Sequence, residues 1–160
     1  YQLSGSSWTG TKLAVSDPAA GNCFGFSVDI AGDYAIAGTF IQSGAGKAYI
    51  YHNAGSGWGA GAILTSPTAT PLYGFSVSIA EGYAVIGSPD ENTGAASSGA
   101  ACIYERTGSN SWIAGTVIAP ATAEAEDVLG SSVSQSGDYV VTGSPGDSAS
   151  QGAAYIWYKR

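Results

Sequence analysis

Few residues in this chain have the type and spacing that catalysis requires. The sequence carries one histidine, His52, whereas acid–base and nucleophilic mechanisms usually need a histidine beside a nucleophile or an acid. No Ser-His-Asp arrangement follows from the spacing, and there is no Gly-x-Ser-x-Gly elbow in a strand-to-helix context. We therefore interpret His52 as a solvated residue beside a hairpin turn. We predict no catalytic residue, no enzyme activity and no cofactor.

Acidic side chains gather in two stretches that could bind a ligand. The stretch PDENTG contains Asp90 and Asn92, and EAED covers residues 124–127; Asp147 is the loop counterpart of Asp90. Such groups could form a cation or ligand site where loops meet, or they could be solvated loops that keep a weakly charged surface soluble. The solvated loop is the favoured interpretation, and Asp90, Asn92 and Asp147 remain candidates for ligand binding.

The two cysteines, Cys23 and Cys102, form no metal-binding motif, because they lie far apart and only His52 could join them as a soft ligand. We favour two small buried residues. A disulfide, within one chain or between two chains, is the alternative.

Composition narrows the range of partners. The net charge of −7 argues against nucleic acid and against an acidic membrane surface, because phosphate binding needs a basic face. No apolar run approaches the ~20 residues that span a bilayer. The absence of methionine suggests a mature chain without its signal peptide, or a trimmed one. We expect a secreted or cell-surface protein.

Three internal repeats organise the chain. The first series of matching segments is FGFSVDIAGDYAIAGT from Phe24, YGFSVSIAEGYAVIGSP from Tyr73 and LGSSVSQSGDYVVTGSP from Leu129. A second series follows as GKAYIY from Gly46, GAACIY from Gly99 and GAAYIW from Gly152. A third series comprises Trp8, Trp58 and Trp112, each with an apolar residue five positions later. A period of about 50 residues indicates a repeat architecture.

Each repeat contains four strand-like runs. Residues 26–30 alternate between apolar and polar side chains, which marks a β-strand. Residues 34–37 are continuously apolar and should be buried on both faces, and residues 48–51 and 12–15 supply the third and fourth runs. Links as short as AGD join antiparallel neighbours. We predict an all-β fold of three β-propeller blades, each with four antiparallel strands.

The repeats resemble the FG-GAP repeat of integrin α-subunit propellers and of secreted bacterial proteins. The FG element is Phe24-Gly25, Tyr73-Gly74 and Leu129-Gly130; the GAP element is Gly87-Ser-Pro89, Gly143-Ser-Pro145 and the divergent Gly38-Thr-Phe40. The resemblance implies a single domain over 1–160, with repeats of about 1–51, 52–104 and 105–160, and a role in binding, adhesion or display.

Calcium-binding members of this family have an Asp-x-Asx-x-Asp-Gly loop between the first and second strands. This chain has only tight turns there, with too few oxygen ligands for calcium. We predict no metal site and interpret Asp33 and Asp138 as turn formers.

The repeats are offset relative to the ends of the sequence. Tyr1 is equivalent to Tyr51 and Tyr104, so the first unit begins with an orphan fourth strand, Thr11 to Val15, and the last unit has three strands. Three blades should not close on themselves, because propellers have about four to eight blades. We expect the orphan strand to complete the last blade of another copy, giving a six-bladed ring from two chains or an open filament. The predicted assembly residues are Trp8, Thr11, Leu13, Val15, Tyr155, Ile156, Trp157 and Tyr158.

The function expected from these features is a non-catalytic, extracellular, self-assembling structural or adhesion protein. Its expected partners are copies of itself, with glycans or surface proteins as further candidates. A carbohydrate-binding lectin of the propeller type is the alternative, since exposed aromatic rings can stack on sugars. The recurrence of Trp8, Trp58 and Trp112 at one repeat position favours packing between blades over sugar contact.

Overall fold

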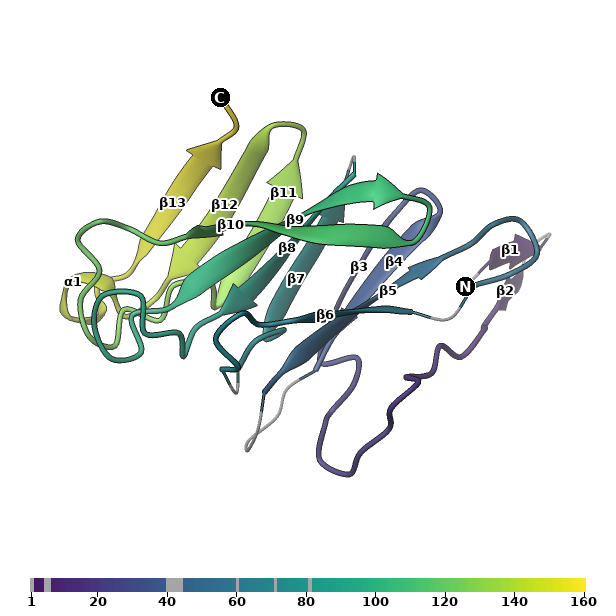
Figure 1. Ribbon diagram of the computed structural model, residues 1–160, viewed down its shortest axis with the longest axis horizontal. Coiled ribbons are helices and arrows are strands. Elements are labelled where there is room, and N and C mark those ends of the chain that lie inside the picture. The colour runs from purple at the N-terminus through teal and green to yellow at the C-terminus, as the bar shows by residue number, and fades with distance from the viewer. Residues whose placement is uncertain (1, 5–6, 40–44, 60, 71, 81) are drawn as a thin grey trace.

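The computed structural model describes residues 2–4, 7–39, 45–59, 61–70, 72–80 and 82–160, which form strands and one short helix (Figure 1). The strands of the first half are β1 (Gln2–Ser4), β2 (Ser7–Thr9), β3 (Ser27–Ala31), β4 (Tyr34–Gly38), β5 (Lys47–His52) and β6 (Ala62–Thr65). They are followed by β7 (Ser76–Ala80), β8 (Tyr83–Ser88), β9 (Ala100–Gly108), β10 (Ser111–Ile118), β11 (Ser132–Ser136), β12 (Tyr139–Ser144), α1 (Asp147–Ser150) and β13 (Ala153–Tyr158). Among the described residues, no helix is long and apolar enough to cross a membrane.

Three antiparallel sheets follow one another along the chain. The first blade has the order β3-β4-β5-β6, the second β7-β8-β9-β10 and the third β11-β12-β13. Each blade begins with a tight hairpin; in the first, Ala31 pairs with Tyr34 across Gly32-Asp33, and Gly32 has φ +56°, which suits a type II′ turn. The all-β prediction of three blades is confirmed, including a last blade of three strands.

The apolar cores lie between the blades. One cluster joins the first and second blades through Ile36, Ile50, Leu64, Val77, Ile79 and Ile86, and another joins the second and third blades through Val85, Ala101, Ile118, Val140 and the partly buried Val133 and Trp157. Because side chains alternate between the two faces of a strand, the second blade can fill both clusters. The second strand β8 is accordingly buried along most of its length, as predicted.

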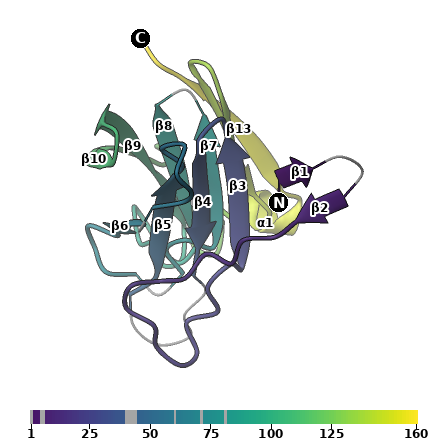
Figure 2. The ribbon, with the colours of Figure 1, turned by 90° about the vertical axis from the view of Figure 1, so that its right-hand side faces the viewer.

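The blades stack side by side, so that the array has two ends. The termini lie at these opposite ends in Figure 1. Figure 2 views the array from the first-blade end, with the β1–β2 hairpin beside it. This hairpin forms its own two-stranded sheet, pairing Leu3 with Trp8.

The N-terminal segment differs from the prediction in one respect. Thr11 to Val15, the expected orphan strand, has no strand structure, because a strand needs a paired neighbour and β13 lies at the other end of the same chain. The short helix α1 was not expected either. Tyr1 and Phe40, which entered the repeat alignment, lie outside the described residues.

Candidate functional site at the open ends of the array

The outer face of the first blade exposes large apolar side chains. Val28 on β3 is 69% exposed, whereas its repeat equivalent Val77 on β7 is 8% exposed. Ile30 is also exposed, and its equivalent Ile79 is buried. The residue types match, so the difference arises from the neighbouring blade, which covers β7 and does not cover β3.

The outer face of the third blade shows the same contrast. Ile156 on β13 is 69% exposed, whereas its equivalent Ile50 on β5 is 0% exposed. Val141 on β12 is exposed, and its equivalents Ile36 and Val85 are buried. Large apolar side chains exposed together on one face commonly mark an interaction site. Each end of the array therefore has a face of the kind that packs inside the array.

Strand β13 supplies four of the predicted assembly residues and has a free edge. In the described part of the chain β13 pairs only with β12. Tyr155 donates a hydrogen bond to Asp147, which raises the pKa of Tyr155 to about 12. Trp157 packs inward and donates through Nε1 to Thr142 Oγ1 at 2.9 Å. Tyr158 and Ile156 point outward and are exposed, so the free edge borders the open face.

The N-terminal segment supplies the other four assembly residues. Trp8 is exposed on β2, Leu13 and Val15 are half-buried, and Thr11 is exposed. The Tyr51 hydroxyl donates to the carbonyl oxygen of Ala14 at 2.9 Å.

An internal contact resembles this one. The hydroxyl of Tyr104, which is the repeat equivalent of Tyr51, donates to the carbonyl oxygen of Thr65 at 2.7 Å. Thr65 belongs to β6, the fourth strand of the preceding blade. The segment at Ala14 therefore lies against the first blade much as a fourth strand of a preceding blade would lie.

An ion pair also holds this segment in place. Asp17 accepts hydrogen bonds from Lys47 Nζ and from the Tyr49 hydroxyl. These two donors, with Lys47 contributing most, hold the pKa of Asp17 below its ordinary value.

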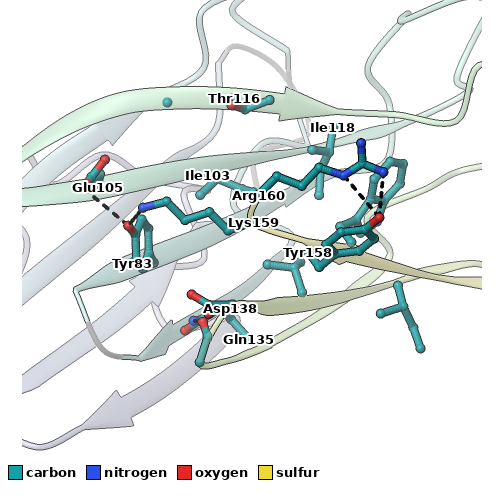
Figure 3. A pocket seen from close by; sticks show the side chains of 15 residues that line it. Tyr83, Ile103, Glu105, Thr116, Ile118, Gln135, Asp138, Tyr158, Lys159 and Arg160 are labelled. Carbon is teal, nitrogen blue, oxygen red and sulfur yellow. Dashed lines mark hydrogen bonds between the residues drawn. The ribbon is translucent and has the colours of Figure 1, made fainter.

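A pocket opens between β10 and β13 (Figure 3), with a volume of about 520 Å³. Its walls include Thr116 and Ile118 from β10 and Trp157 from β13. In the first two blades the fourth strands β6 and β10 contact each other. A fourth strand of the third blade would pair with β13 beside β10, so the pocket occupies part of that strand's place.

Charged and aromatic side chains surround the mouth of this pocket. Lys159 Nζ contacts the Tyr83 hydroxyl, which in turn donates to Glu105 Oε1 at 3.3 Å. The contact with Tyr83 raises the pKa of Lys159. Arg160 binds the Tyr158 hydroxyl through Nη2 at 2.7 Å. Figure 3 shows both groups among the residues that line the pocket.

The candidate ligand-binding residues are engaged by their own loops. Asp90 Oδ1 accepts from Ser97 Oγ at 2.9 Å, and Asn92 Oδ1 accepts from the Ser97 amide at 2.8 Å. Asp147 lies in α1 and accepts from Tyr155 and Ser148, which lowers its pKa. In the described ranges, no group of three or more His, Cys, Asp or Glu side chains is arranged to hold a metal ion. Ligand binding by Asp90, Asn92 and Asp147 stays a prediction.

The cysteines, His52 and Trp112 are best described by their packing and exposure. The thiols of Cys23 and Cys102 are free, so no disulfide joins them within the chain. Cys102 is buried as predicted, and burial raises its pKa to about 12, but Cys23 is exposed. His52 stacks on Tyr34 with ring centroids 4.4 Å apart, so it is packed rather than fully solvated. Trp112 also packs against Tyr34 of the first blade, which confirms packing between blades for Trp112, whereas Trp8 at the same repeat position is 68% exposed.

Sequence reasoning located the free edge but missed the open faces. The predicted assembly residues all lie in strands that would pair. They omit the exposed apolar residues of the two open faces, which are Phe26, Val28 and Ile30 of the first blade and Tyr139 and Val141 of the third. The signal was present in the alignment of repeats: Phe26, Val28 and Ile30 match Phe75, Val77 and Ile79 of the second repeat, and Tyr139 and Val141 match Tyr83 and Val85. The end blades each lack a neighbour on one face, so residues at these positions are more exposed there.

The arrangement of strands defines a class: stacked antiparallel sheets, here two of four strands and one of three, with apolar cores between them have the architecture of β-propeller blades. The FG-GAP repeat family model matches residues 8–51 and 112–157, which together are more than half of the chain. This chain therefore belongs to the FG-GAP repeat family, whose repeats form β-propeller blades. The middle repeat lies outside the two matches, although it has the same strand order. A comparison with curated proteins found no match.

Proposed function

We propose that this protein is a non-catalytic extracellular module that associates with copies of itself, as a structural or adhesion protein. FG-GAP repeats often serve in adhesion and binding, typically in extracellular or cell-surface proteins, and the family is generally non-catalytic. Self-association is the part that this chain's own geometry supports, through the N-terminal segment of one copy and the third blade of the next.

The free edge of β13 is the observation that carries this proposal. An unpaired edge offers a row of main-chain donors and acceptors to an incoming strand. Residues 11–15 are a segment with the sequence of a fourth strand but without a strand partner. Addition of that segment to β13 of a second copy would pair the free edge of β13 and the main chain of residues 11–15 with each other, as in other cases of strand addition.

The internal blades predict the register of this pairing. In the first blade Ala48 pairs with Leu64, and in the second blade Ala101 pairs with Ile118. The repeat equivalents of these pairs are Ala154 on β13 and Ala14 in the N-terminal segment. Ala14 of one copy should therefore lie opposite Ala154 of the next.

Cysteine cross-linking between two separately made variants tests this register. The variants Ala14→Cys and Ala154→Cys, both in a Cys23→Ser background, are mixed and oxidised. Partners in register have Cα atoms close enough for a disulfide, within ~7 Å, so a cross-linked dimer is expected. Ser109→Cys at the tip of the β9–β10 hairpin is the matched exposed control. Equal cross-linking of Ala14→Cys to both partners, or to neither, would refute the proposal.

A further inference from the structure

The two internal blade interfaces repeat one hydrogen bond. Ser27 Oγ of the first blade donates to the carbonyl oxygen of Gly74 in the second at 2.8 Å. Ser76 Oγ of the second blade donates to the carbonyl oxygen of Gly130 in the third at 2.7 Å. The two serines are repeat equivalents, and so are the two glycines of the FG element.

A close backbone approach accompanies this hydrogen bond. A Cβ atom added to Gly38 would lie 2.0 Å from the Gly74 oxygen, and one added to Gly87 would lie 2.1 Å from the Gly130 oxygen. No side chain fits at such distances, so glycine is required on the strand that faces the next blade. Serine and glycine together form a socket that receives the FG glycine of the following blade.

A second contact recurs two residues further along the first strand of each blade. Asp29 Oδ2 of the first blade accepts from Ser78 Oγ at 2.9 Å and from the Ile79 amide at 2.8 Å. Ser78 Oγ of the second blade accepts from the Gln135 amide of the third at 3.1 Å. At both interfaces, the side chain at this position accepts a hydrogen bond from a backbone amide of the next blade. That amide belongs to the residue directly after the repeat equivalent.

The third blade carries an empty copy of this socket. Ser132 and Gly143 are the equivalents of Ser27 and Gly38, and a hollow lies beside them, lined also by Ser144 and Ala153. Among the described residues, neither Ser132 Oγ nor Ser134 Oγ has a hydrogen-bond partner.

The first blade carries the matching FG glycine. A Cβ atom on Gly25 would meet nothing within 4 Å, whereas one on Gly74 would lie 2.4 Å from the Lys47 oxygen and one on Gly130 would lie 2.2 Å from the Ala100 oxygen. Gly25 is thus an FG glycine that no socket in the described chain receives. Its backbone conformation is already the one used inside the array, with φ +85° against +90° at Gly74.

We propose that the third blade of one copy receives the first blade of a second copy through this socket: Ser132 Oγ donates to the Gly25 carbonyl, and Ser134 Oγ donates to the Asp29 carboxylate, as Ser78 Oγ does inside the array. The inference rests on the proposed self-association and names its surface. The exposed side chains Val28 and Ile30 then pack against Val141 and Ile156, as their equivalents pack inside the array.

The charge of Asp29 makes the interface between copies sensitive to the residue at position 134. The copy that enters the socket brings Asp29 of its first blade to the interface. At the interface inside the chain, the third blade has Ser134 at the equivalent position, which carries no charge. An acid at position 134 would therefore place two carboxylates together at the copy–copy interface, where like charges repel. A hydroxyl there can donate to Asp29 instead.

Sedimentation velocity over a concentration series tests the contact with Ser134→Asp. We expect the dissociation constant of the assembly to rise at least tenfold, about 1.4 kcal/mol. Asn110→Asp, in the exposed turn between β9 and β10, adds the same charge and should leave the constant within about threefold of wild type. Asp29→Asn keeps the acceptor for Ser78 and Ile79, and adding it to Ser134→Asp should restore assembly. Ser132→Ala, which removes one hydrogen bond, should weaken assembly about fivefold.

The results distinguish a wrong socket contact from the absence of self-association. If Ser134→Asp assembles like wild type, or Asn110→Asp is equally impaired, or Asp29→Asn gives no rescue, the socket contact is wrong. Self-association by strand addition would still stand in that case if deletion of residues 1–16 abolished assembly. If the wild-type chain of 160 residues stays monomeric, both proposals fail, and the partner of the open faces is a different protein or a further blade.

Discussion

Paired alanine substitutions at Gly87 and Gly143 separate folding from assembly. The two glycines occupy the same repeat position, on β8 and β12, and each faces a serine of its own blade. Gly87 lies against an occupied socket and Gly143 against an empty one. We therefore expect Gly87→Ala to destabilise the free chain, and Gly143→Ala to leave the free chain stable but block its assembly.

The structure sets the size of the effect at Gly87. A Cβ atom there would lie 2.1 Å from the Gly130 oxygen and 2.2 Å from Ser76 Oγ, so the second and third blades must separate locally. Overpacking of this kind costs about 1–3 kcal/mol, and loss of the Ser76 hydrogen bond adds about 0.5–1.5 kcal/mol. For a chain of this size a loss of about 2–4 kcal/mol lowers Tm by roughly 5–15 °C.

Gly143→Ala should behave differently. The added Cβ atom would meet Ser132 Oγ at 2.3 Å and no backbone atom closer than 3.9 Å. Ser132 is exposed, so its side chain can rotate away, and a surface change of this kind costs within about 0.5 kcal/mol. The same methyl group would block the socket and abolish assembly.

Thermal unfolding by circular dichroism, at a concentration where the chain is monomeric, gives the two Tm values, and light scattering gives assembly. A Tm loss at Gly143→Ala as large as that at Gly87→Ala would refute the reasoning. So would normal assembly of Gly143→Ala.

A surface substitution, thiol titration, acid and a metal chelator probe other parts of the structure. Val28→Lys should block assembly without lowering the monomer Tm, because Val28 is exposed in one chain and would be buried between two; a folded Val28→Lys chain that assembles normally would contradict this. Ellman's reagent should titrate one thiol in the native chain, Cys23, and two in denaturant, because Cys102 is buried and its pKa is raised; two native thiols would count against the core as described. The folded-state pKa of Asp17 is depressed, so its contribution to stability is present above about pH 4 and is lost as pH falls below that value; Asp17→Asn should make acid unfolding less steep, as measured by Tm against pH. Addition of EDTA should leave Tm unchanged, and a fall of several degrees would reveal a metal site near Asp90 and Asn92.

The repeat pattern made most of the fold predictable. Alternation in residues 26–30 and the apolar run at residues 34–37 correctly gave adjacent antiparallel strands, because side-chain period and burial are set locally. The alignment of repeats also placed three strand-like runs in the last unit, in agreement with the three-stranded sheet β11-β12-β13.

Features that depend on neighbouring blades could not be read from one repeat. Val28 and Val77 have the same residue type and the same local pattern, yet one is exposed and the other buried. The loss of strand structure at residues 11–15 has the same origin, since pairing depends on a partner that a single chain does not bring to it. The Ser27–Gly74 contact joins residues 47 positions apart, and no local pattern specifies such a distance.

The native mass of the 160-residue chain is the sharpest test of assembly through the open ends. Light scattering coupled to size exclusion, over a concentration series, should give species at multiples of 16.0 kDa for the intact chain. The chain lacking residues 1–16 should stay monomeric under the same conditions. An intact chain that remains a 16.0 kDa species at every concentration, or a truncated chain that forms the same oligomers, would contradict assembly through the open ends.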